Sequence, residues 1–228
     1  MLYTYKIVNN LINILKLEKQ LYTLKSYLIA INQKNIKKTT LMINQKTTIE
    51  NYQKVIKDAE LLYTDTEINK TIDDISKAIT RELKTSNPII MPIMIGGLIL
   101  AGQLIPKLNF PLQIDYIHAT RYNGNTRGGK LNWFKKPNKS LADKTILLID
   151  DILDEGITLS EIIKYCYSQG AKKVLSAVLV KKNLENKKPA ENVDYFGFIV
   201  PNVYIFGYGM DYCEYHRNAP GIYAVTKS

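Results

Sequence analysis

The chain has little cysteine, with two such residues in 228. Neither Cys166 nor Cys213 has a second cysteine or a histidine at the spacing of a metal-binding motif. A disulfide framework and a structural metal site are therefore not predicted. We expect a reduced, cytoplasmic protein, with Cys166 packed in the core.

Long hydrophobic runs are also missing. No stretch approaches the roughly twenty consecutive apolar residues that span a bilayer, so we expect no membrane partner. Lysine and asparagine interrupt the apolar residues at the N-terminus, so a secretory signal is not predicted. The apolar fraction of 46% and the charged fraction of 23% are those of a globular domain.

Arginine is absent from the first fifty residues, although the whole chain has a formal charge of +10. Eight lysines against two glutamates place +6 of that charge in this segment. Because arginine is the usual side chain that reads bases, a basic segment without it argues against a nucleic-acid partner. A codon bias toward lysine and asparagine would raise the charge without any function.

The first fifty residues also differ in pattern. Apolar residues near helical spacing predict one or two helices, broken by a polar, lysine-rich stretch at 32–40. We place a domain boundary between Thr47 and Asn51. Residues 1–50 would form a helical or partly disordered extension, and residues 51–228 the main domain. The extension either packs as an appendage or presents a helix to a partner.

Strands and helices alternate along the main domain, which predicts an α/β fold with a mostly parallel twisted sheet and helices on both faces. A ligand would lie in the crevice outside the carboxyl ends of the strands. The expected helices cover 66–83, 98–105 and 158–168, and the expected strands cover 89–95, 112–122, 131–134, 145–150 and 174–180.

The most informative segment runs from Thr145 to Leu159. Its apolar run ends in Asp150 and Asp151, and a later Gly-x-Thr turn opens an amphipathic helix. Free N–H groups and the positive dipole end at a helix start suit a phosphate dianion. Paired acids suit ribose hydroxyls and a metal ion. The segment predicts a site for a phosphorylated sugar; a core strand with a solvated acidic turn is the plainer alternative.

Residues 150–158 resemble the phosphoribosyl-pyrophosphate (PRPP) motif of type I phosphoribosyltransferases. Downstream, Lys181 after an apolar run and the segments 203–212 and 214–217 follow an order similar to that of hypoxanthine-guanine phosphoribosyltransferases. This resemblance covers about 55–225. It implies the type I fold with a small hood subdomain, and purine salvage that converts hypoxanthine or guanine and PRPP to IMP or GMP. It also implies Mg²⁺ and a homodimer or homotetramer.

The resemblance assigns roles within the motif. Asp154 would be the general base that accepts the N7 proton of the purine. Asp150 and Asp151 would hold the ribose hydroxyls, while residues 155–158 would bind the 5′-phosphate. The complete predicted PRPP-binding set is Asp150, Asp151, Glu155, Gly156, Ile157 and Thr158.

Purine recognition would come from later residues. A cation at Lys181 donates to a purine carbonyl oxygen, whereas adenine presents an amino donor there, so oxopurines should be preferred. Tyr204 would stack on the base. From the residues alone, the plainer alternative is that Lys181 is a solvated strand end and Tyr204 packs in the core. The predicted purine-binding residues are Lys181, Tyr204, Ile205 and Asp211, and the predicted metal ligands are Asp150 and Asp211.

A turn at Met94 to Gly97 follows another strand. Its two glycines let backbone amides approach an anion. In the family this loop binds pyrophosphate and often contains a cis peptide. Ile95 stands where many relatives have lysine, which removes a charge but leaves the backbone donors. We predict pyrophosphate binding by Ile95, Gly96 and Arg217; a tight packing turn is the alternative.

Residues 124–130 fit the G-x-x-x-x-G-K pattern of a P-loop. A P-loop continues with Ser or Thr and a helix, but Leu131 and an extended segment follow here, so we reject a nucleotide triphosphatase. The segment resembles the mobile loop of the family, with Arg121-Tyr122 in place of the usual Ser-Tyr pair. A flexible hairpin tip is the alternative.

A second class of function stays open. A non-catalytic regulator on the same fold would sense PRPP and touch nucleic acid through the basic extension. Ile95 and the extension favour it, whereas the combination of Lys181, Asp211 and Arg217 argues against it. The extension also lacks a clear helix-turn-helix pattern. We assign His118 and His216 to the structure and not to the chemistry.

Overall fold

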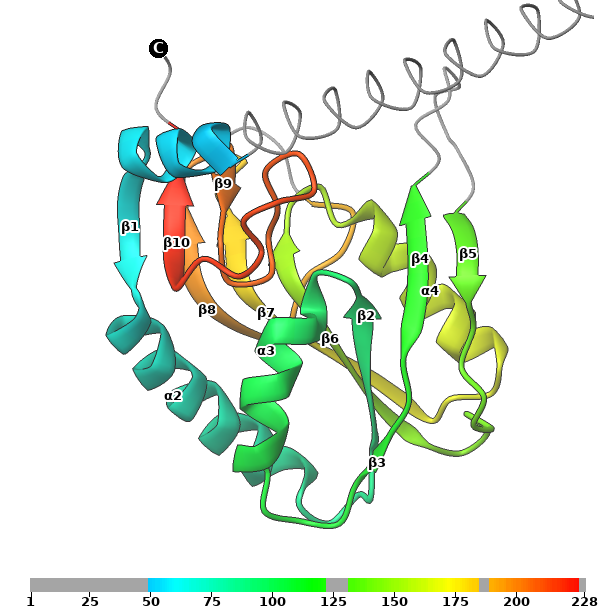
Figure 1. Ribbon diagram of the computed structural model, residues 1–228. Coiled ribbons are helices and arrows are strands. Elements are labelled where there is room, and N and C mark those ends of the chain that lie inside the picture. Colours follow the sequence, from blue (N-terminus) through cyan, green and yellow to red (C-terminus); the bar gives the residue numbers. More distant parts are fainter. Residues whose placement is uncertain (1–48, 122–130, 185–188, 226–228) are drawn as a thin grey trace, which may run out of the picture. The chain divides into compact units, whose positions relative to one another are not determined.

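The computed structural model describes residues 49–121, 131–184 and 189–225, with no side chain for Arg121 (Figure 1). Contacts along the chain divide it into two units, Met1–Lys54 and Val55–Ser228. Residues 49–58 are helical. The predicted extension lies largely outside the described residues, and its boundary at residues 50 and 51 stays a prediction.

A seven-stranded sheet forms the centre of the second unit, in the order β5-β4-β2-β6-β7-β8, with β3 paired to β2. Only β5 runs antiparallel to its neighbour. The predicted mostly parallel sheet is therefore confirmed. The strands are β2 (Ile89–Met94), β3 (Gln113–Ile114), β4 (Ile117–Arg121), β5 (Leu131–Lys135), β6 (Thr145–Leu153), β7 (Lys173–Lys182) and β8 (Tyr195–Val200).

Helices cover both faces of this sheet (Figure 1). On one face lie α2 (Asp65–Leu83) and α3 (Gly97–Leu104), which share one hydrophobic cluster. On the other lies α4 (Ile157–Ser168), whose Cys166 is fully buried in a second cluster, as predicted. No helix of the described residues is both long and apolar enough to cross a membrane.

The start of α2 follows from its sequence. Thr64 caps the helix, because its hydroxyl accepts the N–H of Glu67 and the Glu67 carboxylate accepts the N–H of Thr64 in return. Apolar residues at helical spacing form the buried face of this helix, and they are Ile68, Ile72, Ile75 and Ile79.

Two element ends differ from prediction. Strand β6 continues to Leu153 and β7 to Lys182, because their parallel ladder still pairs Ile152 with Val180 and Leu153 with Lys181. The acid pair therefore lies inside β6, not at its end. The helix expected at 98–105 is α3, which ends at Leu104, and Pro106 follows inside a 3₁₀ turn, η1 (Ile105–Lys107), where proline needs no N–H partner.

A smaller antiparallel sheet forms the predicted hood. Its order is β1-β10-β9, so β1 (Glu60–Thr64), early in the chain, lies beside β10 (Gly221–Ala224), near its end (Figure 1). The third strand is β9 (Ile205–Phe206). Ile205 and Ile222 pack into the cluster that α2 and α3 also share. This packing holds the hood over the carboxyl ends of the parallel strands.

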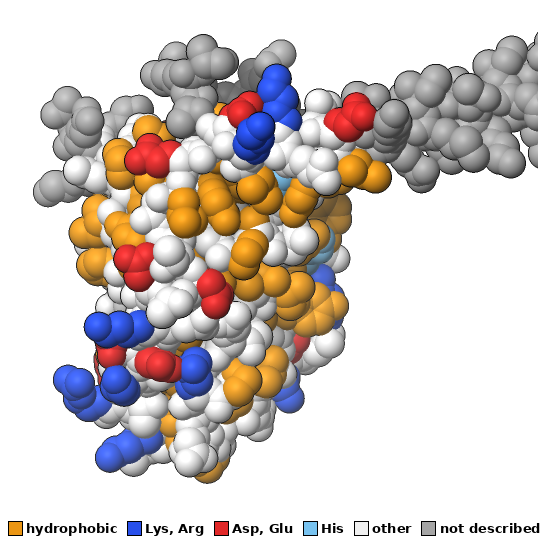
Figure 2. All heavy atoms as spheres, turned by 60° about the vertical axis from the view of Figure 1, so that its left-hand side comes forward, with side chains coloured by type: hydrophobic (Ala, Val, Ile, Leu, Met, Phe, Trp, Pro, Cys, Tyr) orange, Lys and Arg blue, Asp and Glu red, His pale blue; other side chains and the backbone are white. Residues whose placement is uncertain are grey.

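The face that carries α2 has mixed charge. Lys and Arg side chains gather toward its lower end beside Asp and Glu, while hydrophobic side chains occupy much of the remainder (Figure 2). Lys77 pairs with Asp74 at 2.9 Å and Lys107 with Asp73 at 2.7 Å. Because acids interrupt the lysines, this face offers no continuous basic surface for nucleic acid.

Candidate active site

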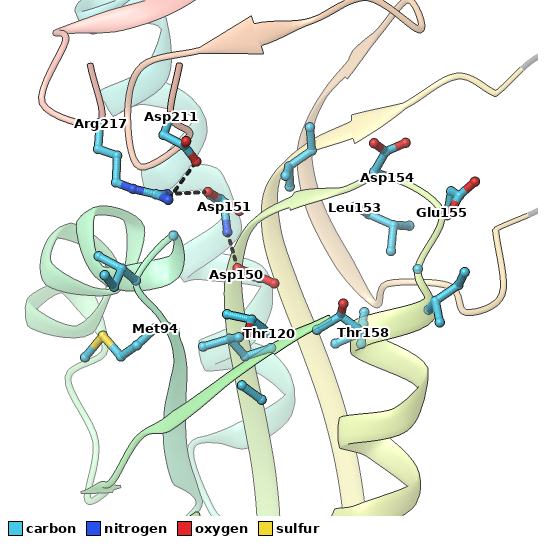
Figure 3. A pocket seen from close by; sticks show the side chains of 18 residues that line it. Met94, Thr120, Asp150, Asp151, Leu153, Asp154, Glu155, Thr158, Asp211 and Arg217 are labelled. Atoms are coloured by element: carbon cyan, nitrogen blue, oxygen red, sulfur yellow. Dashed lines mark hydrogen bonds and ion pairs between the residues drawn. The ribbon is translucent and has the colours of Figure 1, made fainter. Parts of the chain in front are cut away.

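A cavity of about 480 Å³ lies at the carboxyl ends of β2 and β6, beneath the hood (Figure 3). Four segments of the chain line it: residues 93–96 at the end of β2, Ala119 and Thr120 in β4, residues 150–159 from β6 into α4, and Asp211 with Arg217 from the hood. The cavity thus brings together most of the predicted site residues, namely Ile95, Gly96, Asp150, Asp151, Asp154, Glu155, Gly156, Ile157, Thr158, Asp211 and Arg217.

The phosphate cradle is the turn that opens α4. Gly156 is its N-cap with φ +73°, a left-handed conformation that favours glycine, and no side chain caps the helix. The first N–H groups of α4 are therefore left for a ligand. Ser160 N–H already donates to Gly156 O at 2.9 Å, so the helix is regular from its first turn.

A second segment supports this cradle from behind. The N–H of Ala190 donates to the carbonyl oxygen of Glu155 at 2.7 Å. Because the C=O and N–H of a trans peptide point in opposite directions, this bond also orients the N–H of Gly156. A Cβ on Gly156 would lie 3.0 Å from the backbone N of Glu191, so the two segments are in close contact. The sequence analysis missed this support, since no motif marks it.

The acid pair is enclosed and carries excess negative charge. Asp151 is 7% exposed, and its N–H donates to Asp150 Oδ1 at 3.0 Å. Burial, then the charge of Asp151, raises the pKa of Asp150 well above its ordinary value. Burial also raises the pKa of Asp151, although the contact with Asp150 and the charge of Arg217 oppose the shift. Two such carboxylates favour a nearby cation.

Arg217 supplies part of that positive charge and joins the hood to the sheet. Its Nη2 lies 2.6 Å from Asp211 Oδ1, and its Nη1 lies 3.8 Å from Asp151 Oδ2 (Figure 3). Nη1 also donates to Gly209 O at 2.6 Å. The guanidinium is therefore held between two acids at the cavity wall, where a phosphate group could meet it.

The pyrophosphate loop has close backbone packing. The peptide bond between Met94 and Ile95 is cis, as the resemblance led us to expect. A Cβ on Gly96 would collide with the Asp151 carboxylate, and one on Gly209 would lie 2.5 Å from Gly96 O. Gly209 has φ +108°. The sequence analysis assigned Gly209 no role and so missed its part in hood packing.

Asp154 lines the cavity and has a partner that was not predicted. Lys182 Nζ lies 3.1 Å from Asp154 Oδ2. Lys181, the predicted purine contact, has its Nζ 5.4 Å from the centre of the Phe196 ring and does not line the cavity. Adjacent side chains of a strand point to opposite faces, so only one of these two lysines meets Asp154.

Two further predicted residues, Tyr204 and Ile205, lie outside the cavity lining. Tyr204 is 52% exposed, and its hydroxyl donates to Asp211 O at 3.1 Å. Its ring lies on the hood, where a ligand can reach it. Ile205 is buried in the core. Arg121 ends β4, but its side chain and the whole of Tyr122 lie outside the described residues. Thr120, one residue earlier, does line the cavity and was missed.

The donors fit Mg²⁺ bound together with a phosphorylated ligand. Mg²⁺ commonly takes one or two carboxylates and completes its shell with waters and substrate oxygens. Asp150 and Asp151 are suitable hard donors, whereas Asp211 is already paired with Arg217. Among the residues that the structure describes, no group of three or more His, Cys, Asp or Glu side chains is arranged to hold a metal unaided.

The parallel sheet, the hood and the cradle beside paired acids define a phosphoribosyltransferase. Residues 59–213 match the phosphoribosyl transferase domain family. The chain belongs to this family, and its central sheet, covering helices and hood are the type I phosphoribosyltransferase fold.

The relatives are more specific. The chain is 32% identical over 152 residues to the bifunctional protein TilS/HprT of Listeria innocua, covering 66% of this chain but only 23% of that protein. It is 30% identical over 156 residues to the hypoxanthine-guanine phosphoribosyltransferase of Aquifex aeolicus, covering 68% and 87% of the two chains. A solved hypoxanthine phosphoribosyltransferase from Staphylococcus aureus matches with a TM-score of 0.70 at 27% identity, over 75% and 93% of the chains.

Proposed function

We propose that this protein is a purine-salvage enzyme that transfers the phosphoribosyl group of PRPP to hypoxanthine or guanine, forming IMP or GMP and pyrophosphate. The main support is the single cavity that combines a helix-start cradle, a buried acid pair and the Asp211–Arg217 pair. Two relatives named as hypoxanthine-guanine phosphoribosyltransferases, of which the chain covers 84% and 87%, support the same reaction.

The cradle and the acids divide the recognition of PRPP between them. Backbone N–H groups of residues 155–158 and the Thr158 hydroxyl bind the 5′-phosphate. The carboxylates of Asp150 and Asp151 accept the ribose hydroxyls. Ile95 and Gly96 offer backbone donors to the pyrophosphate, and Arg217 pairs with its charge. Because Ile95 brings no cation, Arg217 contributes the positive side chain of this cavity wall.

Mg²⁺ belongs to this proposal. Asp150 would hold the ion, with Asp211 as the second predicted donor, and the ion would stabilise the charge on the departing pyrophosphate when bound. For Asp211 to contribute, Arg217 has to share or release its carboxylate. The raised pKa of Asp150 supports a cation at this position, since a bound cation favours the ionised carboxylate.

Asp154 is the residue that moves the proton. Purine N9 forms a bond to ribose C1′ while the bond from C1′ to the pyrophosphate oxygen breaks, and the N7 proton passes to the Asp154 carboxylate. Asp154 is 51% exposed at the cavity, so a ligand can reach it. Lys181, Tyr204 and Ile205 remain the predicted purine contacts, although none of them lines the cavity.

Initial rates test the proposal, measured with PRPP, Mg²⁺ and one base at a time. We expect turnover with hypoxanthine or guanine and little with adenine. PRPP binding without turnover of any purine would contradict the proposal and favour the regulator. A homodimer or homotetramer and a cytoplasmic location accompany the proposal and rest on the sequence alone.

A further inference from the structure

The ion pair between Lys182 and Asp154 differs from the surface ion pairs of this protein. The Lys182 side chain is 13% exposed, so its stem is held within the protein, and its Nζ meets Asp154 Oδ2 at 3.1 Å. In the pair Lys164–Glu161 on α4, the two side chains are 69% and 50% exposed. Exposed pairs contribute little because both side chains move freely, whereas a held lysine restricts its partner.

The two oxygens of the Asp154 carboxylate have different surroundings. Asp154 lines the cavity and Lys182 does not, so the lysine approaches from the protein side. Oδ2 accepts from Lys182, and among the described residues Oδ1 has no hydrogen-bond donor. One oxygen is thus anchored and the other is left to accept a proton.

The position of Asp154 explains why an anchor is needed. It follows the last residue of β6, so the strand ladder no longer holds its backbone. The neighbouring β7 continues to Lys182 and provides the nearest rigid support. Lys181 cannot hold the Asp154 carboxylate, because its side chain points to the opposite face of the strand and lies over Phe196.

We propose that Lys182 is a positioning residue, which holds the Asp154 carboxylate so that Oδ1 faces the N7 proton of the bound purine. This proposal rests on the proposed function of Asp154. The ammonium also balances the carboxylate charge in the free enzyme. When the proton arrives on Oδ1, the contact to Oδ2 can persist as an ordinary hydrogen bond.

The test compares single-turnover rates of nucleotide formation, because product release often limits steady-state rates. Lys182→Met keeps the length of the stem and removes the charge; we expect a rate about 10-fold lower, since a small misplacement of a reacting group has effects of this size or larger. PRPP affinity should stay unchanged. Lys182→Arg should restore most of the rate, and the control Lys164→Met should match the parent.

A double-mutant cycle separates positioning from a general structural role. In the Asp154→Asn background, Lys182→Met should cause no further loss, because the group that it positions no longer accepts a proton. An equal loss in both backgrounds, or no loss in the parent, would overturn the proposal. If Lys182→Met lowers the melting temperature, Lys182→Gln provides the same test with a polar head group. If the parent enzyme does not turn over oxopurines, the proposed function itself is contradicted, and not only the role of Lys182.

Discussion

Asp154 combines exposure to the cavity with one anchored oxygen. We expect Asp154→Asn to lower kcat by about 10²-fold or more, the usual effect of losing a general base. PRPP binding should be nearly intact, because the cradle and the acid pair are untouched. Initial rates and PRPP titration by calorimetry measure the two effects. A correctly folded variant with the parental kcat would remove Asp154 from the mechanism.

Asp150 should show opposite effects on stability and on binding. Its raised pKa means that, between the ordinary pKa and the raised one, the folded state binds more protons than the unfolded state, so the stability of the fold falls as the pH rises through this range. Asp150→Asn removes this loss. At pH 8 we expect a melting temperature a few degrees above the parent, at about 2–4 °C per kcal/mol, together with weaker binding of Mg²⁺ and PRPP.

Thermal melts of both proteins across pH check the Asp150 prediction. The difference should disappear near pH 4, which is close to the ordinary pKa of about 3.9 for an aspartate. If the melting temperature of the variant at pH 8 is equal to or below that of the parent, ionisation of Asp150 does not destabilise the fold.

At the scale of elements, the segment after β7 supports the phosphate cradle through one backbone bond, from Ala190 N–H to Glu155 O. Proline has no N–H, so Ala190→Pro removes this bond. We expect the KM for PRPP to rise about 3- to 10-fold, because such a bond contributes about 0.5–1.5 kcal/mol. The matched control, Ala190→Gly, keeps the N–H and should retain the parental KM. Equal effects of both variants would argue against the orienting role.

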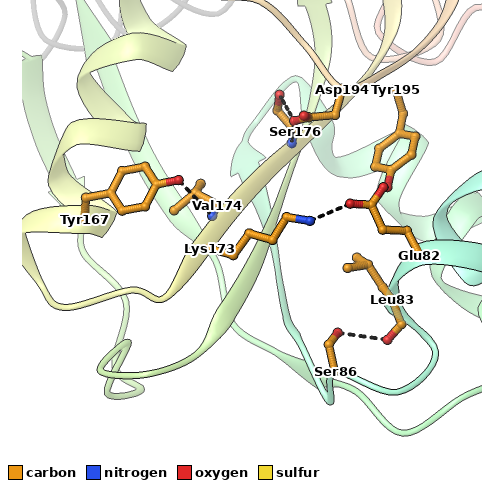
Figure 4. Close-up of polar contacts among 9 residues, drawn as sticks. All are labelled: Glu82, Leu83, Ser86, Tyr167, Lys173, Val174, Ser176, Asp194 and Tyr195. Atoms are coloured by element: carbon orange, nitrogen blue, oxygen red, sulfur yellow. Dashed lines mark hydrogen bonds and ion pairs between the residues drawn. The ribbon is translucent and has the colours of Figure 1, made fainter.

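A polar network joins the end of α2 to the starts of β7 and β8 (Figure 4). Glu82 accepts from Lys173 Nζ and from the Tyr195 hydroxyl, each at 2.5 Å. The Lys173 contact and then the Tyr195 contact lower the pKa of Glu82. The ionised carboxylate thus stabilises the fold above its ordinary pKa, and the contribution is lost as the pH falls through the lowered value.

Glu82→Gln should therefore destabilise the protein slightly at pH 7. Both ionic side chains are more than 40% exposed, so solvent screens the pair and we expect a loss below about 1 kcal/mol. The difference from the parent should shrink when melts are repeated at acid pH. A difference that stays constant down to pH 3 would show that the charge of Glu82 is not its cause.

For the whole molecule, all residues of the cavity belong to the unit Val55–Ser228. We expect deletion of residues 1–50 to leave kcat and KM within about threefold of the parent, because a unit with its own core carries its own site. Melting temperature and solubility serve as controls. A folded, truncated protein without turnover would make the extension part of the active assembly.

The rival regulator makes a different prediction for the same deletion. It expects salt-dependent binding of DNA or RNA that disappears with the extension. The mixed charge on the face of α2 and the enzymes among the relatives offer it no support.

The cradle could be predicted from sequence because its parts are consecutive. Gly156 and the start of α4 follow Asp154 directly, so local preferences determine the turn and the free N–H groups. The alternation of strands and helices likewise predicted the parallel sheet, and the sequence pattern placed α2 within one residue of its observed start. Local pattern misplaced the end of β6, because pairing with β7 continues past the acid pair.

Sequence alone therefore determined the class of fold and the phosphate-binding motif, since both depend on neighbouring residues and on periodicity. Tertiary structure decided which distant side chains meet. Arg217 reaches Asp151 only because the hood packs over β6, and Gly209 matters only because it touches Gly96. Lys182 meets Asp154 because the register of β7 beside β6 selects one of two adjacent lysines. Such registers follow from packing of the whole sheet, which no local pattern specifies.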